Sequence, residues 1–140
     1  MNSKPKPAQM RQQILDDHRQ IGELLSKVAA ATSAAETLAS LQPLQPLLQR
    51  HFKEEEDEID GLHGTIMQQA PQHANALLGL KDEHRQLLES VQHLLDLAHK
   101  GDDPRLRELG QLLKGQLAAH ETRETEIFVD SIWTDLGAGD

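Results

Sequence analysis

Apolar residues recur at alternating spacings of three and four along most of this chain, and no other feature constrains the fold as much. This spacing places apolar side chains on one face of an α-helix, and no segment shows the strict alternation of a β-strand. Short connections between such helices favour an antiparallel up-down-up-down four-helix bundle. We therefore predict an all-α protein forming a single domain over residues 1–140, with flexible tails at 1–8 and 135–140. The predicted helices cover about residues 9–30, 44–61, 72–100 and 103–134.

Prolines and glycines set the predicted helix boundaries. Because proline lacks the N–H that a helix interior needs, Pro43 and Pro46 place the start of the second helix near Leu44. A separate short helical piece is expected over residues 34–41. The glycine-containing connection over residues 61–71 is long for a bundle and leaves room for a short helical turn.

Charge and composition exclude several kinds of function. The chain has 23 acidic and 14 basic residues and a formal net charge of −9, which argues against binding to nucleic acid or to an anionic membrane. Its first residues lack the apolar run of a secretory signal, and no segment is apolar enough to span a membrane, so we expect a cytoplasmic protein. Cysteine is absent, which excludes disulfides, thiolate metal sites and iron–sulfur clusters. Any metal must be held by nitrogen and oxygen atoms.

The apolar faces are interrupted near their middles by histidine and glutamate, where leucine or isoleucine is expected. The six interrupting residues are His18, His51, Glu55, His84, His120 and Glu124. Burying one polar group without a partner costs roughly 2–7 kcal/mol, whereas the whole net stability of a domain is roughly 5–15 kcal/mol. A single buried histidine is usually satisfied by a neighbour, but six such residues must satisfy one another or share a ligand. We therefore predict a metal site in the core with these six residues as ligands.

The spacing of these residues indicates two matching halves. Each half contains a lone histidine followed by a His-x-x-x-Glu pair, whose members are four residues apart on one helix face. Around the lone histidines, residues 17–20 read Asp-His-Arg-Gln and residues 83–86 read Glu-His-Arg-Gln. Such a repeat packs about an approximate two-fold axis. Two equivalent ligand sets then face each other, which suggests two metal ions bridged by the glutamates.

This pattern, from about residue 10 to residue 130, resembles the hemerythrin-like family of HHE cation-binding domains. The resemblance implies an up-down four-helix bundle and a non-haem di-iron centre with bridging glutamates and an oxo or hydroxo bridge. Oxygen-carrying hemerythrins have a second histidine four residues from the one on the third helix, and here Leu80 and Leu88 take those places. The ligands that the resemblance implies are the lone histidines His18 and His84 and the pairs His51 with Glu55 and His120 with Glu124.

Imidazole and carboxylate ligands suit iron, zinc, manganese or copper, and iron is our first choice. The Glu-x-x-His motif of ferritin-like di-iron proteins is absent. The favoured function is binding of iron and, through it, of dioxygen, nitric oxide or peroxide, in sensing, storage or stress protection. One alternative is a di-iron enzyme acting on peroxide, nitric oxide or ferrous iron, which requires an electron-donor partner. Another is a zinc-bound or metal-free helical interaction module, and a homodimer is compatible with each function.

The other histidines are predicted to be solvated surface residues: His63, His73, His93 and His99. His63 is distinguished by its place in a connection that can fold back over one end of the bundle. Glu58, seven residues after His51, is a candidate extra ligand. Phe52 and Phe128 are predicted to pack beside the site and to shield it from water.

Overall fold

The computed structural model describes residues 7–57 and 61–137, and within these ranges all regular secondary structure is helical. This confirms the predicted all-α class. A short helix, α3 (Leu62–Gln69), and a 3-10 turn, η1 (Pro71–His73), connect the second long helix to the third. Glu58 and the side chain of Phe128 lie outside the described residues. The long helices are α1 (Pro7–Ala30), α2 (Ala34–Glu56), α4 (Ala74–His99) and α5 (Arg105–Gly137).

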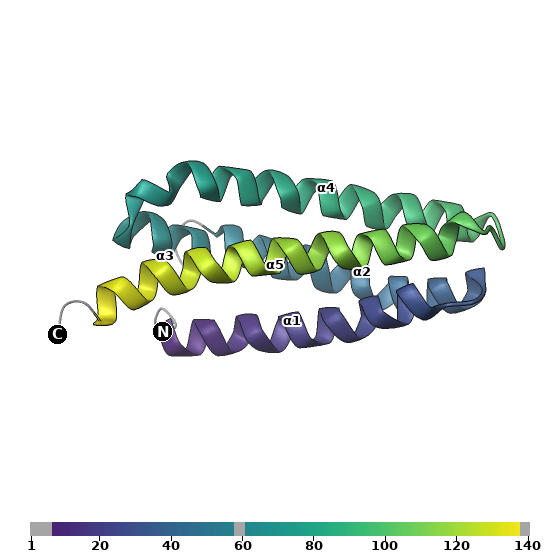
Figure 1. Ribbon diagram of the computed structural model, residues 1–140, viewed down its shortest axis with the longest axis horizontal. Helices are drawn as coiled ribbons and strands as arrows, with labels where there is room; N and C mark the ends of the chain where they lie inside the picture. Colours follow the sequence, from purple (N-terminus) through teal and green to yellow (C-terminus); the bar gives the residue numbers. More distant parts are fainter. Residues whose placement is uncertain (1–6, 58–60, 138–140) are drawn as a thin grey trace.

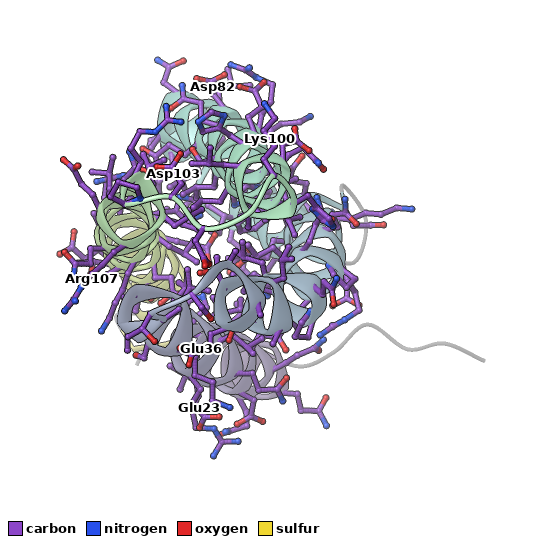
Figure 2. The ribbon with its side chains drawn as sticks, turned by 90° about the vertical axis from the view of Figure 1, so that its right-hand side faces the viewer. Glu23, Glu36, Asp82, Lys100, Asp103 and Arg107 are labelled. Atoms are coloured by element: carbon purple, nitrogen blue, oxygen red, sulfur yellow. The ribbon has the colours of Figure 1, made fainter. Side chains whose placement is uncertain are left out.

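The long helices lie side by side (Figure 1). The chain passes along α1, returns along α2, passes again along α4 and returns along α5. α1 packs against α2 and α5, and α4 packs against the same two helices, so the four surround a common interior. The short helix α3 lies at the end where α1 begins, in contact with α2 and α5. Figure 2 views the bundle from the opposite end and shows charged side chains such as Glu23, Asp82 and Arg107 on its outside.

The predicted start of the second helix near Leu44 is wrong, because α2 runs without interruption from Ala34 through both prolines. Leu44 is fully buried, whereas Pro43 and Pro46 are exposed. The prolines therefore remove hydrogen bonds on the solvent side of the helix, where water can replace the missing N–H donors.

The beginning of α2 is stabilised by an N-cap at Ser33, which the prediction from the prolines did not consider. The Ser33 side chain accepts a hydrogen bond from the Glu36 amide at 3.2 Å. In return, the Glu36 carboxylate accepts a hydrogen bond from the Thr32 amide at 2.9 Å. This reciprocal arrangement is close to a capping box, and its Ser-x-x-Glu signature is visible in the sequence.

Two apolar clusters occupy the interior and leave a polar layer between them. The larger cluster draws on all four long helices, with Ile21, Phe52, Leu87 and Leu117 nearest the polar layer in sequence. The smaller cluster joins α3 to the start of α1 and α4: Ile14, Leu62, Ile66, Ala70, Leu77 and Leu80. Each long helix therefore contributes its interrupting histidine or glutamate at the level where one apolar cluster ends and the other begins.

Candidate metal centre

All six residues predicted from the sequence reach this polar layer. Five of them are buried, with exposed fractions of 1–4%, and the side chain of His18 is 11% exposed. α1 contributes one residue, α4 one, and α2 and α5 a His-x-x-x-Glu pair each. In chain order they are His18, His51, Glu55, His84, His120 and Glu124.

The Glu124 carboxylate lies at the centre of the group. Its Oε1 is 3.3 Å from Nε2 of His18, and its Oε2 is 3.5 Å from Nε2 of His84 and 3.5 Å from Nε2 of His120. Both halves of the chain therefore direct imidazole nitrogens at one carboxylate.

Glu55 bridges the halves from the α2 side. Its Oε2 is 3.2 Å from Nε2 of His51 on the same helix, and its Oε1 is 3.4 Å from Nε2 of His84 on α4. The two glutamates thus each approach histidines from both halves, as bridging carboxylates would.

These converging atoms are buried and unsatisfied. Among the described residues, the Nε2 atoms of His18, His84 and His120 and all four carboxylate oxygens of Glu55 and Glu124 have no hydrogen-bond partner. Buried polar atoms are normally hydrogen-bonded, and each exception needs an explanation such as a missing ion. Nitrogen and oxygen donors pointing at a common space are the donor set that a divalent metal requires.

Three histidines of the centre, His51, His84 and His120, each have a carboxylate at the opposite ring nitrogen, Nδ1. We did not predict these carboxylates. The pairs, each joined through the histidine Nδ1, are Asp17 with His51 at 2.8 Å, Glu56 with His84 at 2.6 Å and Glu83 with His120 at 2.7 Å. Each carboxylate accepts a hydrogen bond from the Nδ1–H group, which leaves the Nε2 lone pair free to face the centre. Metal-binding histidines almost always have such a partner, which fixes the ring and its tautomer.

Two of these carboxylates could have been found from the repeat. Asp17 and Glu83 directly precede the lone histidines, at equivalent positions of the two halves. Each reaches across to the paired histidine on the next helix, His51 or His120. The shared acid-His-Arg-Gln letters therefore reflect a shared contact between neighbouring helices.

His63 is not the surface residue that we predicted. It is 7% exposed, and its ring stacks on that of His84 with centroids 5.6 Å apart and planes at 28°. Its Nε2 is buried without a hydrogen-bond partner in the described part of the chain. Of the other outlying histidines, His93 and His99 are exposed and His73 is half-buried.

Two groups of potential ligand atoms lie close enough to hold an ion each. Within each group, all the atoms lie within 4.8 Å of one another. Glu124 belongs to both groups, whereas His120 meets this distance criterion in neither, although it lies beside Glu124. The first group is His18, His51, Glu55 and Glu124, and the second is His63, His84 and Glu124.

The two glutamates have opposite protonation preferences. Burial raises the pKa of Glu55 well above its usual value, and the adjacent Glu124 charge raises it further. Burial alone would also raise the pKa of Glu124, but contacts with Glu55 and the surrounding imidazoles hold it well below its usual value. Two carboxyl groups in one buried site cannot both ionise easily, so without metal the pair holds one proton.

The histidine pKa values also follow from burial and neighbouring carboxylates. Burial lowers the pKa of His51, although Asp17 opposes this effect. Burial likewise lowers the pKa of His63 to about 4, with the nearby His84 as the next cause. For His120, burial acts in the same direction, but Glu124 and Glu83 outweigh it and the pKa is raised. His51 and His63 are therefore neutral near pH 7, as metal ligands must be.

Phe52 covers the centre on the side of the larger apolar cluster. Its ring stacks on His84 with centroids 4.0 Å apart and planes at 7°, and it meets the ring of His120 edge-on at 5.7 Å. It is 3% exposed and belongs to the larger cluster. Phe52 therefore packs beside the site as predicted and separates it from water.

Comparison with known proteins adds no assignment. The chain matches no family model, and neither a curated protein nor a solved structure is significantly similar to it. None of the described helices contains a stretch long and apolar enough to cross a membrane. The residues and geometry of the centre are therefore the observations that bear on function.

Proposed function

We propose that this chain is a hemerythrin-like antiparallel four-helix bundle that binds two non-haem iron ions and, through them, a small ligand. The observation that carries the proposal is the arrangement of the imidazoles. Carboxylates hold Nδ1 of His51, His84 and His120, and Nε2 atoms of the histidines lie 3.2–3.5 Å from two buried glutamates, whose carboxylate oxygens have no hydrogen-bond partner among the described residues. This is the arrangement expected of a metal centre with oriented histidine ligands.

The donor set fits two divalent ions. His18 and His51 would hold one ion and His84 and His120 the other, with Glu55 and Glu124 shared between them. The shared glutamates lie within 3.2–3.5 Å of these four histidines. Binding of cations would also remove the repulsion between the two carboxylates and replace the proton that they share. Zinc or manganese would suit the same nitrogen and oxygen atoms.

With about three or four protein ligands per ion, coordination positions stay open to an exogenous molecule. A bound iron pair would supply a redox-active Lewis acid for dioxygen, nitric oxide or peroxide. The protein holds the histidine tautomers through Asp17, Glu56 and Glu83 and excludes water with Phe52 and the two apolar clusters. Sensing, storage or stress protection follows from reversible binding at such a centre. An enzyme acting on peroxide, nitric oxide or ferrous iron would use the same centre with an electron-donor partner.

One observation favours a second candidate, a metal-free helical interaction module. In the metal-free protein, protonated Glu55 beside ionised Glu124 is an internally consistent pair. A proton on Glu55 would relieve the repulsion between the two carboxylates without any ion, so this pair is compatible with a metal-free protein.

Metal analysis separates the two candidates. We would purify the protein from iron-supplied cells, measure metal per chain by elemental analysis, and record the near-ultraviolet and visible spectrum. The proposal predicts about two irons per chain and charge-transfer bands that respond to reductant, dioxygen or nitric oxide. A colourless protein that holds zinc or no metal, and that takes up no iron in vitro, would contradict it.

A further inference from the structure

The short helix α3 is held against the end of α2 by a close backbone approach at Gly61. The Gly61 amide donates a hydrogen bond to the Asp57 carbonyl at 3.0 Å. A Cβ atom at residue 61 would collide with the carbonyl oxygens of Glu54 and Asp57. Only glycine fits this contact, which brings the start of α3 against the last turn of α2.

Two apolar anchors then fix the orientation of α3. Leu62 and Ile66, four residues apart on one helix face, are 2% and 1% exposed and belong to the smaller apolar cluster. The Thr65 hydroxyl donates to the Gly61 carbonyl at 3.0 Å and supports the first turn. With these anchors buried, the intervening His63 is directed at the polar layer.

We infer that His63 is a fifth nitrogen ligand of the centre, bound to the ion on the His84 side. This inference rests on the proposed metal-binding function. His63 supplies one atom of the second ligand group, together with His84 and Glu124, and these atoms lie within 4.8 Å of one another. Its buried Nε2 lacks a hydrogen-bond partner among the described residues, and leaving such a group unsatisfied costs about 1–3 kcal/mol. A metal ion satisfies it.

A ligand on α3 makes the two ions unequal. The ion on the α1–α2 side has two histidines, whereas the ion on the α4–α5 side has three, one of them from outside the long helices. A cavity of about 480 Å³ between α3 and α4 is lined by His63, Met67 and Leu78 and reaches the surface. The third histidine therefore stands between this cavity and its metal, and metal binding fastens α3 over the centre.

The test compares His63→Gln with His93→Gln, which removes an exposed histidine of α4 away from the centre. Each metal-free protein is titrated with Co²⁺, whose visible absorption reports the number and type of its ligands. Hydrogen exchange of the α3 amides is measured before and after loading. We expect Co²⁺ to slow exchange in α3 of the parent protein and of H93Q. In H63Q, we expect about 10- to 100-fold weaker binding of one Co²⁺ and no added protection of α3.

The outcomes separate this inference from the proposed function. If the parent protein binds no Co²⁺ or iron, both are wrong. If H63Q loads two ions with the parent's affinities, spectrum and α3 protection, His63 is not a ligand but the metal centre stands. His63→Ala guards against a packing defect in H63Q, because added imidazole can enter from the adjoining cavity. Recovery of the parent Co²⁺ spectrum with imidazole supports the inference, and a spectrum that imidazole leaves unchanged opposes it.

Discussion

The α1–α2 and α4–α5 halves of the molecule form the same carboxylate–histidine contact from matching sequence motifs. In each half, an acidic residue precedes the lone histidine and binds Nδ1 of the paired histidine on the next helix. Asp17 reaches His51 at 2.8 Å, and Glu83 reaches His120 at 2.7 Å. The near-equality of these distances indicates that the repeat preserves the support of the histidines as well as the histidines themselves.

The halves differ around their lone histidines. Nδ1 of His84 binds Glu56 at 2.6 Å, and its ring stacks on Phe52. In the described part of the chain, the carboxylate nearest Nδ1 of His18 that contacts it is that of Glu121, at 4.0 Å, and burial raises the pKa of that carboxyl to about 7. The α4–α5 half therefore holds its lone histidine more rigidly. The shared residues create two matching sets of candidate ligands, and the residues that depart from the repeat make those sets different.

The largest expected loss of metal binding comes from removing a glutamate that contacts histidines of both halves. Glu124→Ala or Glu55→Ala should abolish loading of two ions, because no neighbouring residue on either helix replaces the bridging carboxylate. The matched controls are Glu126→Ala and Glu54→Ala, which remove exposed carboxylates of the same two helices. Metal per chain is measured by elemental analysis and helix content by circular dichroism. Full metal content in E124A or E55A would show that the ligand set is wrong.

A smaller effect, confined to one half, is expected from Asp17→Asn or Glu83→Gln. Each change weakens the support of one paired histidine, and loss of such a partner typically reduces metal affinity about 10- to 100-fold. Stepwise Co²⁺ titration should show one weakened ion and one unchanged ion in each variant. Asp16→Asn and Asp82→Asn serve for comparison, because they change neighbouring carboxylates whose side chains are 49% and 53% exposed. Equal weakening of both ions in both variants would contradict the assignment of each acid to its own half.

His84 is held by a carboxylate more closely than His18 is, so removing the two carboxylates should weaken metal binding to different extents. Glu56→Gln removes a carboxylate 2.6 Å from His84, whereas Glu121→Gln removes one that is 4.0 Å from His18 and makes no hydrogen bond to it. We expect E56Q to weaken metal binding about ten-fold and E121Q to weaken it less. The same Co²⁺ titration measures both. An effect of E121Q as large as that of E56Q would show that the 4.0 Å contact also supports its histidine.

The site residues that can be predicted from the sequence are those whose burial depends on helix periodicity. His18 and Glu124 interrupt apolar faces, so their burial follows from their position on the helix. The continuity of α2 depends on which side Pro43 and Pro46 face, and apolar periodicity around Leu44 already places both on the exposed side. The predicted start of the second helix near Leu44 was wrong because it took no account of the side of the helix on which the prolines lie.

His63 marks the limit of this kind of prediction. Its burial depends on how closely α3 approaches the end of α2, which the Gly61 backbone contact sets. A glycine in a connection signals many kinds of turn, and neither its spacing nor the composition of residues 61–71 specifies where the next side chain points. Tertiary contacts of Leu62 and Ile66 make that choice, and these appear only in three dimensions.

The smallest expected effects compare the caps of α2 and α5, which occupy equivalent places in the two halves. Ser33 caps α2 through its hydroxyl, and Asp103 accepts hydrogen bonds from the Arg105 amide at 2.8 Å and from its guanidinium. Hydrogen bonds from the Arg105 side chain, then from its amide, lower the pKa of Asp103 to about 2 from a usual 3.8. The stabilisation by ionised Asp103 is therefore complete above pH 3.8 and is lost as the pH falls towards 2.

Chemical denaturation across this pH range should separate the two caps. Ser33→Ala should lower the free energy of unfolding by about 1 kcal/mol at every pH, because a hydroxyl does not titrate here. Asp103→Asn keeps a capping side chain and removes only the charge, so its difference from the parent should be present at pH 5 and shrink between pH 3.8 and 2. A pH-independent difference for D103N would mean that the ion pair with Arg105 does not stabilise the fold. The two halves would then begin their second helices by the same uncharged mechanism.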